Sequence, residues 1–341
     1  MDGREHRWFI LTASVAPLIG VFVAMALLWN RLFHWSDLVA LVVMYTICAF
    51  GISTGYHRLL THRSFRTARP IYLALATAGA MAGQGPPIIW AAHHRRHHRV
   101  ADREGDPHSP HLGFEPGFKG ILRGLWHAHL GWLFDVDLKS EPMRYCPDLV
   151  RDRALRWISE KFVLVVLAGI VLPGLIGLAL TGTLTGALTG ALWGGFVRLF
   201  LVNHMTYAVN SVGHYFGRRR FGTLDHSRNV AWLAIPSFGE AWHNNHHAFP
   251  RSARHGMKWW EVDISAIFIW SLEKVGLASH VIRIDPEKLA LREGGVSLVG
   301  NVRPADRTPA ASAEELLTAP AAPPLSERRP ASELVSVTDV E

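Results

Sequence analysis

The chain contains only two cysteines and comparatively few charged residues. Cys48 and Cys146 are too few for a disulfide framework. So low a cysteine count also excludes thiolate-held zinc, rubredoxin-type iron and iron–sulfur clusters, because each of these sites needs several sulfur ligands. Charged residues make up 18% of the 341 residues, against about a quarter in an average soluble domain. Since the mean hydropathy is only +0.13, the apolar residues must be concentrated in segments.

Four apolar stretches are long enough to cross a hydrocarbon core of ~30 Å as helices. They cover about residues 8–29, 38–55, 162–180 and 184–204. Short connections inside each pair predict two antiparallel hairpins. A cleaved signal peptide is the alternative for the first stretch, but this stretch is longer than the usual ~7–15-residue signal core and no clear small-x-small site follows it.

Positive charge is distributed unevenly about these stretches. Residues 57–156 hold fifteen Lys and Arg, and fifteen more follow Val202, whereas the two hairpin connections offer only Arg31. The positive-inside rule therefore places the N-terminus, the central region and the C-terminal region in the cytoplasm, and we expect a bacterial inner membrane. Nucleic-acid binding is not expected despite a pI of 9.7, because the basic residues border membrane segments without a binding motif.

Three other segments differ from the four apolar stretches. Residues 71–92 are apolar but contain Gly83, Gly85, Pro86 and Pro87, which predicts a helix that returns or lies in the interface without crossing. Residues 259–278 mix apolar residues with Glu and Lys at helical spacing, as in an interfacial or cap-packing helix. The Pro-, Ala- and Ser-rich residues 301–341 predict a disordered tail.

The sequence thus predicts an all-α integral membrane protein with four transmembrane helices and a cytosolic helical cap that holds a histidine-rich dimetal site. The membrane domain is expected over residues 1–300, with the cap formed by residues 57–160 and 205–300.

Histidine is abundant, with twenty residues, and much of it is clustered. The clusters are HRLLTH at 57–62, HRRHH at 94–98 and HNNHH at 243–247. Residues at i, i+3 and i+4 share one helix face, so each HxxHH group can direct three imidazoles at a common point. His214 follows the last apolar stretch on the same side. For His6, His34, His255 and His280 we expect ordinary surface or hydrogen-bonded roles.

Nine clustered imidazoles exceed what one ion can bind, so the pattern predicts two metal ions. The expected ligands are His57, His62, His94, His97, His98, His214, His243, His246 and His247. Imidazole suits Zn, Cu, Fe and Ni alike. Structural zinc sites usually include cysteine, and a hydrolytic zinc site needs only three protein ligands. An all-nitrogen set beside a membrane favours redox iron that activates dioxygen against a lipidic substrate.

At these residues the chain resembles the membrane-bound fatty acid desaturases, specifically the bacterial acyl-CoA or acyl-lipid Δ9 branch related to stearoyl-CoA desaturase. The resemblance covers about residues 40–280. It rests on HRLLTH, HRRHH, GDPHSP (105–110), HLGWLF (129–134), VNSVGH (209–214) and GEAWHNNHHAFP (239–250).

The resemblance implies a di-iron centre held by the same nine histidines. Asn210 matches an asparagine that holds a metal-bound water, and Gln84, Trp90 and Thr206 match residues at the bend of the acyl tunnel. His93 stands one place outside the matched ligands and is expected not to bind metal. Ala92 and His93 replace a charged pair near the coenzyme A end in animal enzymes, so acyl-CoA, acyl-lipid and carrier-linked substrates all remain open.

The expected reaction is the O2-dependent removal of two hydrogens from a saturated acyl chain, which leaves a cis double bond. Two electrons must come from a separate donor such as ferredoxin or cytochrome b5 with its reductase, because the chain has neither HPGG nor a suitably placed GxGxxG. The basic surface around Arg218, Arg219 and Arg220 can face such an acidic donor or anionic lipids. For Arg198 we expect either snorkelling to the interface or contact with the acyl head group.

Two other functions remain as alternatives. A hydroxylase or ketolase on the same histidine scaffold would retain an oxygen atom in its product. A membrane metal-binding or transport protein is disfavoured, because residues 38–53 and 162–180 contain no Asp, Glu, Lys, Arg or His.

Overall fold

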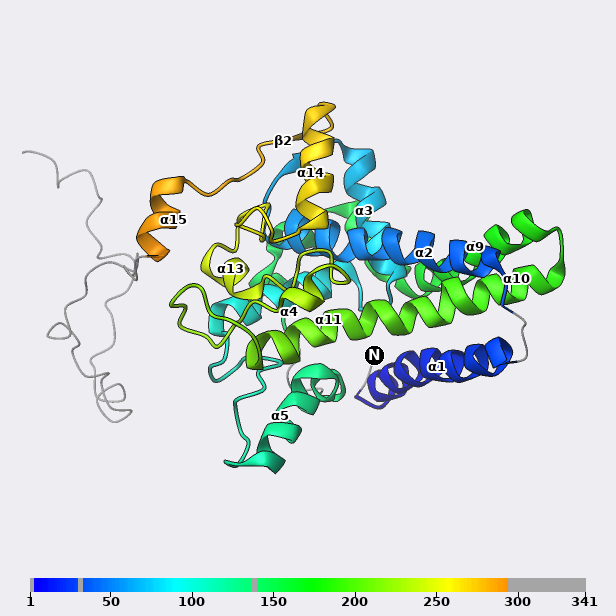
Figure 1. The fold of residues 1–341 in the computed structure, drawn as a ribbon, viewed down its shortest axis with the longest axis horizontal. Helices are drawn as coiled ribbons and strands as arrows, with labels where there is room; N and C mark the ends of the chain where they lie inside the picture. Colours follow the sequence, from blue (N-terminus) through cyan, green and yellow to red (C-terminus); the bar gives the residue numbers. More distant parts are fainter. Residues whose placement is uncertain (1–2, 30–32, 136–139, 294–341) are drawn as a thin grey trace, which may run out of the picture. The chain divides into compact units, whose positions relative to one another are not determined.

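A computed structural model describes residues 3–29, 33–135 and 140–293 (Figure 1). The described chain is mostly helical. Its two short strands, β1 (Arg66–Thr67) and β2 (Ala278–Ser279), pair antiparallel. The predicted tail over 301–341 and the domain boundary at residue 300 lie outside the described residues.

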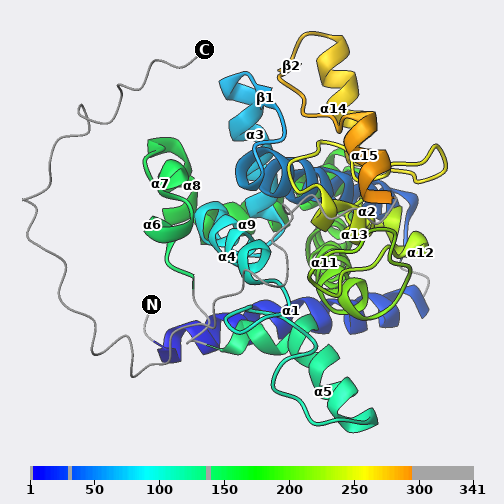
Figure 2. The same cartoon turned by 90° about the vertical axis from the view of Figure 1, so that its left-hand side faces the viewer.

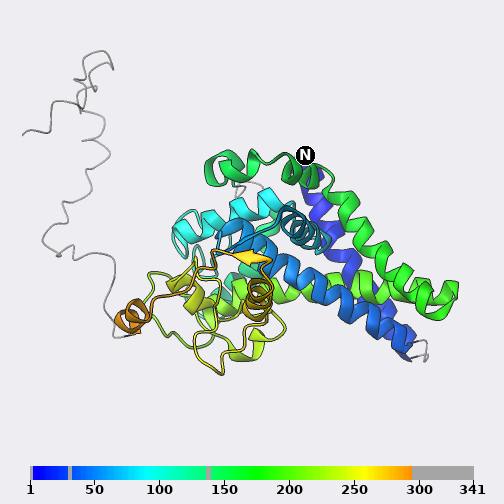
Figure 3. The ribbon, with the colours of Figure 1, turned by 90° about the horizontal axis from the view of Figure 1, so that it is seen from above.

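Four helical stretches in the described chain are long and apolar enough to cross a membrane. The first is Ile10–Leu27 within α1 (Gly3–Trp29), and the third is Phe162–Thr181 (α9). The second, Trp35–Thr61, is formed by α2 (Trp35–Phe50) and the π-helical η1 (Gly51–Thr61). The fourth, Leu184–Tyr215, is formed by α10 (Leu184–Gly190), η3 (Ala191–Val197) and α11 (Arg198–Tyr215). The all-α fold with four spanning helices is therefore confirmed. Figures 1 and 3 show α2 and α11 running alongside one another.

The second and fourth helices extend beyond their predicted spans. All of η1 is buried, so its backbone keeps helical hydrogen bonds after the apolar sequence has ended. This continuation carries His57 out of the spanning segment, and the continuation of α11 carries His214. Two membrane helices thus deliver metal-site candidates directly to the cap.

The cap is built from short helices and loops. Figure 2 shows α4 (Pro87–Val100) beside the short helices α6 (Pro142–Tyr145), α7 (Pro147–Val150) and α8 (Arg153–Glu160). The remaining cap elements are α5 (Phe118–His129), the 3-10 turn η2 (Gly131–Phe134), α12 (Ala231–Ala234), α13 (His243–Ala248), α14 (Ile264–Lys274) and α15 (Pro286–Glu293).

Residues 71–92 form two helices with a sharp break between them. The first is α3 (Arg69–Met81), and the chain then turns at Gly83 and Gly85, whose φ angles are 73° and 110°. Positive φ favours glycine, and the two prolines that follow fix the start of α4. The segment is not among the spanning helices of the described chain, as predicted. Gly79 of α3 lies against Gly51, where an added Cβ would be 2.2 Å from the Gly79 nitrogen.

Arg198 neither snorkels nor reaches a head group, so both expectations for it are wrong. Its side chain is fully buried and donates hydrogen bonds to the carbonyl oxygens of Met81 (2.7 Å), Gly169 (2.6 Å) and Gly194 (3.0 Å). The carbonyls belong to three different helices. Without the arginine, these carbonyl oxygens would lose a hydrogen-bond donor in a region without water. The guanidinium therefore fastens α3 and α9 to the fourth spanning helix.

Replacement of Arg198 tests this role. We expect Arg198→Met to lower the free energy of unfolding in detergent by at least about 3 kcal/mol, because hydrogen bonds to a charged group contribute about 1.5–3 kcal/mol each. The exposed Arg156→Met on α8 is the matched control. Equal unfolding midpoints for the two variants would contradict the assignment.

Candidate metal centre

The nine histidines singled out from the sequence come from four helical elements and lie together. His57 is on η1 and His62 directly follows it, α4 supplies three, α11 supplies His214 and α13 supplies three. Their ring nitrogens form two groups, and within each group the nitrogens lie within 4.8 Å of one another. The first group contains His57, His62, His94, His98 and His246, and the second contains His97, His214, His243 and His247.

In the first group the Nε2 atoms face one another across short gaps. His246 Nε2 lies 3.0 Å from His57 Nε2 and 2.8 Å from His98 Nε2, which in turn lies 3.0 Å from His94 Nε2. His62 Nε2 is buried without a hydrogen-bond partner. Burial and neighbouring imidazoles lower the pKa values of His62, His94, His98 and His246 well below the ordinary value, so these rings are neutral lone-pair donors.

The second group repeats this arrangement. His243 Nε2 lies 2.9 Å from His214 Nε2 and 3.1 Å from His247 Nε2, and His247 Nε2 lies 3.4 Å from His97 Nε2. Burial lowers the pKa of His247 to about 4, although Asp225 opposes the shift. Neighbouring ligands at right angles on an ion with metal–nitrogen bonds of about 2.0–2.1 Å would lie about 3 Å apart. Both groups therefore fit a metal ion.

Four carboxylates contact the opposite ring nitrogen, Nδ1, of histidines in these groups. Asp106 Oδ1 lies 3.0 Å from His97, Asp102 Oδ2 lies 2.8 Å from His214, Asp225 Oδ2 lies 3.0 Å from His247, and Glu240 lies against His57. A carboxylate at Nδ1 holds the proton there and leaves the Nε2 lone pair free.

The same contacts keep the carboxylates ionised. Burial alone would raise the pKa values of Asp102, Asp106 and Asp225, but hydrogen bonds and charge from the paired imidazoles lower all three. Sequence reasoning missed these residues. Asp106 and Glu240 stand in the GDPHSP and GEAWHNNHH motifs, but no local spacing marks Asp102 or Asp225.

Arg58, which lies inside the first histidine motif, binds one of these four carboxylates. It is fully buried, donates to Asp263 at 2.9 Å and to Glu240 at 3.2 Å, and contacts His255 Nδ1 at 3.1 Å. His255 is therefore a buried partner of Arg58, within the hydrogen-bonded role expected for it. The arginine fixes the carboxylate that orients His57.

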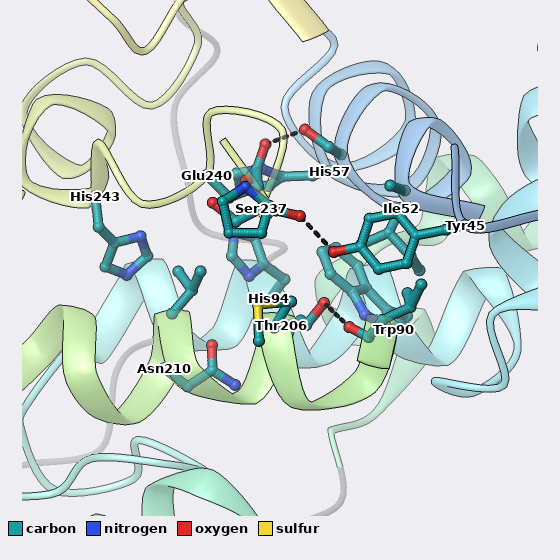
Figure 4. A pocket seen from close by; sticks show the side chains of 16 residues that line it. Tyr45, Ile52, His57, Trp90, His94, Thr206, Asn210, Ser237, Glu240 and His243 are labelled. Carbon is teal, nitrogen blue, oxygen red and sulfur yellow. Dashed lines mark hydrogen bonds and ion pairs between the residues drawn. The ribbon is translucent and has the colours of Figure 1, made fainter. Parts of the chain in front are cut away.

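A narrow cavity of about 50 Å³ opens onto both histidine groups (Figure 4). His57 and His94 reach it from the first group and His243 from the second. Apolar side chains such as Ile52, Val202 and Val209 form much of the remaining wall. Asn210 also lines the cavity, one helical turn before His214. An apolar channel of this kind would place an alkyl chain beside both groups.

The three residues predicted at a tunnel bend are joined to one another. Gln84 Nε2 donates to Thr206 Oγ1 at 2.8 Å, and Trp90 Nε1 donates to Gln84 Oε1 at 3.2 Å. Trp90 and Thr206 line the cavity. The Trp90 ring also stacks on His94, with ring centroids 5.0 Å apart. The network therefore fixes the cavity wall relative to the first histidine group.

The remaining histidines lie outside the two groups. His93 Nδ1 lies 3.1 Å from Ser140 Oγ, and its ring meets Trp132 edge-on. The backbone N–H of His34 donates to Asp37 at the start of α2, and His280 is exposed. The side chain of His6 lies outside the described part of the chain.

Comparison with known proteins identifies similar chains. The family described as fatty acid desaturase matches residues 33–264. The chain is 44% identical to a hex-5-enoyl-[acyl-carrier protein] acetylenase of Moorena producens (strain JHB), over 82% of this chain and 87% of that protein. It is 37% identical to an sn-1 stearoyl-lipid 9-desaturase of Anabaena variabilis (75% and 88% covered) and to Delta-9 acyl-lipid desaturase 1 of Arabidopsis thaliana (81% and 85%).

Removal of one orienting carboxylate tests the two-group arrangement. We expect Asp225→Ala to weaken metal binding at the second group by about 10–100-fold, because loss of such a partner releases the ligand His247. The first group should keep its ion, so metal content per chain should fall by half in a chelator titration followed by elemental analysis. The exposed Glu104→Gln is the control. Full retention of metal by Asp225→Ala at every chelator concentration would count against the arrangement.

Proposed function

The chain belongs to the fatty acid desaturase family, and on that premise we propose that it forms a cis double bond at the Δ9 position of a saturated acyl chain. Introducing a double bond into an acyl chain is the activity of the family, and the protein is an acyl desaturase of the membrane. The observation that most supports the proposal is the approach of both histidine groups to one narrow cavity. The names of the 9-desaturase relatives support the Δ9 position.

The cofactor of the proposal is a pair of iron ions. The five imidazoles of the first group would hold one and the four of the second group the other, with Asn210 positioned to hold a bound water. Iron in such a site supplies the oxidising power toward an unactivated C–H bond that no amino-acid side chain has.

The overall reaction sets what the protein must bring together. A –CH2–CH2– unit, one O2, two electrons and two protons give a –CH=CH– unit and two waters. The apolar wall holds the alkyl chain and keeps solvent water away from the reacting carbons. The Gln84–Trp90–Thr206 network fixes where the chain bends and therefore which methylenes face the histidine groups. Tyr45 donates a hydrogen bond to the carbonyl oxygen of Pro236 (2.6 Å) and contributes to the same wall.

For the head group we propose an acyl-lipid substrate. The 9-desaturase relatives are named for stearoyl-lipid and acyl-lipid substrates, and a cavity beside four spanning helices lies close to the source of such chains. The acetylenase relative is named for an acyl-carrier-protein substrate, so a carrier-linked chain is the second candidate. Acyl-CoA is the third candidate.

The electrons are proposed to come from a separate carrier, such as ferredoxin or cytochrome b5 with its reductase. The proposed orientation places the N-terminus, the histidine groups and the C-terminus on the cytoplasmic face of a bacterial inner membrane. The thirty Lys and Arg on that side of the four spans support it.

The activity is tested in a bacterial host that cannot make unsaturated fatty acids. We expect expression with a ferredoxin and its reductase to yield cis-Δ9 monounsaturated chains, located by mass spectrometry of the lipids. The His243→Ala variant should yield none. Saturated lipids alone, in membranes that contain iron-loaded protein and a competent donor, would contradict desaturation. Hydroxylated or keto chains would assign the other oxidase chemistry.

The orientation is tested with single cysteines, since both native cysteines are buried. Leu184→Cys, at the exposed first residue of the fourth span, should react with a membrane-impermeant maleimide in intact spheroplasts. Arg251→Cys in the cap should react only after lysis. The opposite pattern would invert the proposed orientation.

A further inference from the structure

One surface loop, residues 223–228, connects to two histidines of the second group. Asp225 Oδ2 contacts His247 Nδ1 at 3.0 Å. The backbone N–H of His226 donates to Asp102 Oδ2 at 2.8 Å, and that same oxygen contacts His214 Nδ1 at 2.8 Å. Two adjacent loop residues are therefore linked to two different metal-site histidines through one carboxylate each.

The loop is held in place by its own hydrogen bonds. Arg219 Nη2 donates to the carbonyl oxygens of Thr223 (2.7 Å) and Asp225 (2.8 Å). Asp225 Oδ1 accepts from the Thr223 hydroxyl and the Ser227 backbone, both at 2.9 Å. The loop lies beyond the C-terminal end of α11 (Figure 1). A fixed loop keeps a constant path between the surface and the histidines.

Apolar side chains are exposed on this loop and at the end of α11. Leu224, at its tip, is 76% exposed, and Phe216 is 51% exposed. The His226 ring is exposed and contacts His111 with centroids 4.4 Å apart. His111 Nε2 in turn contacts the backbone oxygen of His214 at 2.8 Å, which adds a second connection between the loop and His214.

The charge around this patch is positive. Residues 215–230 contain four arginines and one acid, Asp225, whose carboxylate is engaged by His247. Arg218 and Arg219 are exposed. Exposed apolar and charged side chains lie close together in sequence here, and protein interfaces combine such groups. A small interface suits a transient electron-transfer complex. Positive charge would steer an acidic partner toward it.

We propose that the patch formed by Phe216, Arg218, Leu224 and His226 docks a small acidic one-electron carrier protein, and that electrons reach the second histidine group through this loop. The inference rests on the proposed function, because only a reaction that consumes electrons needs such a partner. Each docking event oxidises one carrier by one electron, and two events supply the two electrons of each double bond. The contacts through Asp102 and Asp225 connect this loop to His214 and His247 without a gap.

The test uses the full chain in nanodiscs of zwitterionic lipid, with a plant-type [2Fe–2S] ferredoxin and soluble cytochrome b5 as probes. Leu224→Glu and Arg218→Glu are made separately, because both side chains are exposed and either change should leave the fold intact. We expect each to raise the Kd of at least one carrier by about tenfold and to flatten its salt dependence. Arg153→Glu on α8 is the matched control, an exposed arginine on a different face, and should keep the wild-type Kd.

Two measurements separate this inference from the proposed function. The Kd, together with the stopped-flow rate at which the reduced carrier is oxidised, reports docking, whereas product formed with dithionite as reductant reports desaturation. The docking proposal is overturned if both patch variants keep the wild-type affinity and oxidation rate. It is also overturned if neither carrier binds to the wild type. Carrier binding that depends on the loop, without product from the dithionite-reduced wild type, would retain the docking surface and contradict the proposed function.

Discussion

The structure depends on a set of hydrogen bonds between carboxylates and Nδ1 atoms that aim imidazoles at two common points. Nine imidazoles gathered into two groups, with neighbouring Nε2 atoms as little as 2.8–3.4 Å apart, have no favourable arrangement among themselves, because most of these nitrogens present lone pairs. Asp102, Asp106, Asp225 and Glu240 hold protons on the outward nitrogens and so keep the inward ones available. Arg58 holds Glu240, so the orienting shell extends one layer further.

Helix length connects this centre to the membrane. The second and fourth spanning helices do not end with their apolar sequence but continue to Thr61 and Tyr215, and these continuations carry His57 and His214. The cavity runs between the same two helices, with Tyr45 and Ile52 on one and Val202 to Asn210 on the other. The proposed alkyl chain would therefore lie between these two helices, beside the histidines. Arg198 fastens α3 and α9 to the fourth spanning helix through hydrogen bonds to the carbonyl oxygens of Met81 and Gly169.

Much of this arrangement follows from local sequence. Apolar runs predicted the four spans. The i, i+3, i+4 spacing predicted that the three imidazoles of each HxxHH group meet at a common point, and this was wrong, because α4 and α13 each divide their three imidazoles between the two metal groups. The orienting carboxylates could not be predicted from local sequence, because a pair such as Asp102 and His214 is separated by 112 residues and meets only in the folded chain. Arg198 was misjudged for the same reason, since two of its three acceptors, on Met81 and Gly169, lie on other helices. The lengths of the second and fourth helices also depend on tertiary burial rather than on the hydrophobicity of their own residues.

X-ray absorption at the iron edge, combined with Mössbauer spectra of ⁵⁷Fe-loaded protein, tests the central claim most directly. The account predicts two iron sites per chain, both ligated by imidazole nitrogen, with one site lost when His247 is replaced and the other when His62 is replaced. A single iron site, or a first shell that contains sulfur, would contradict it.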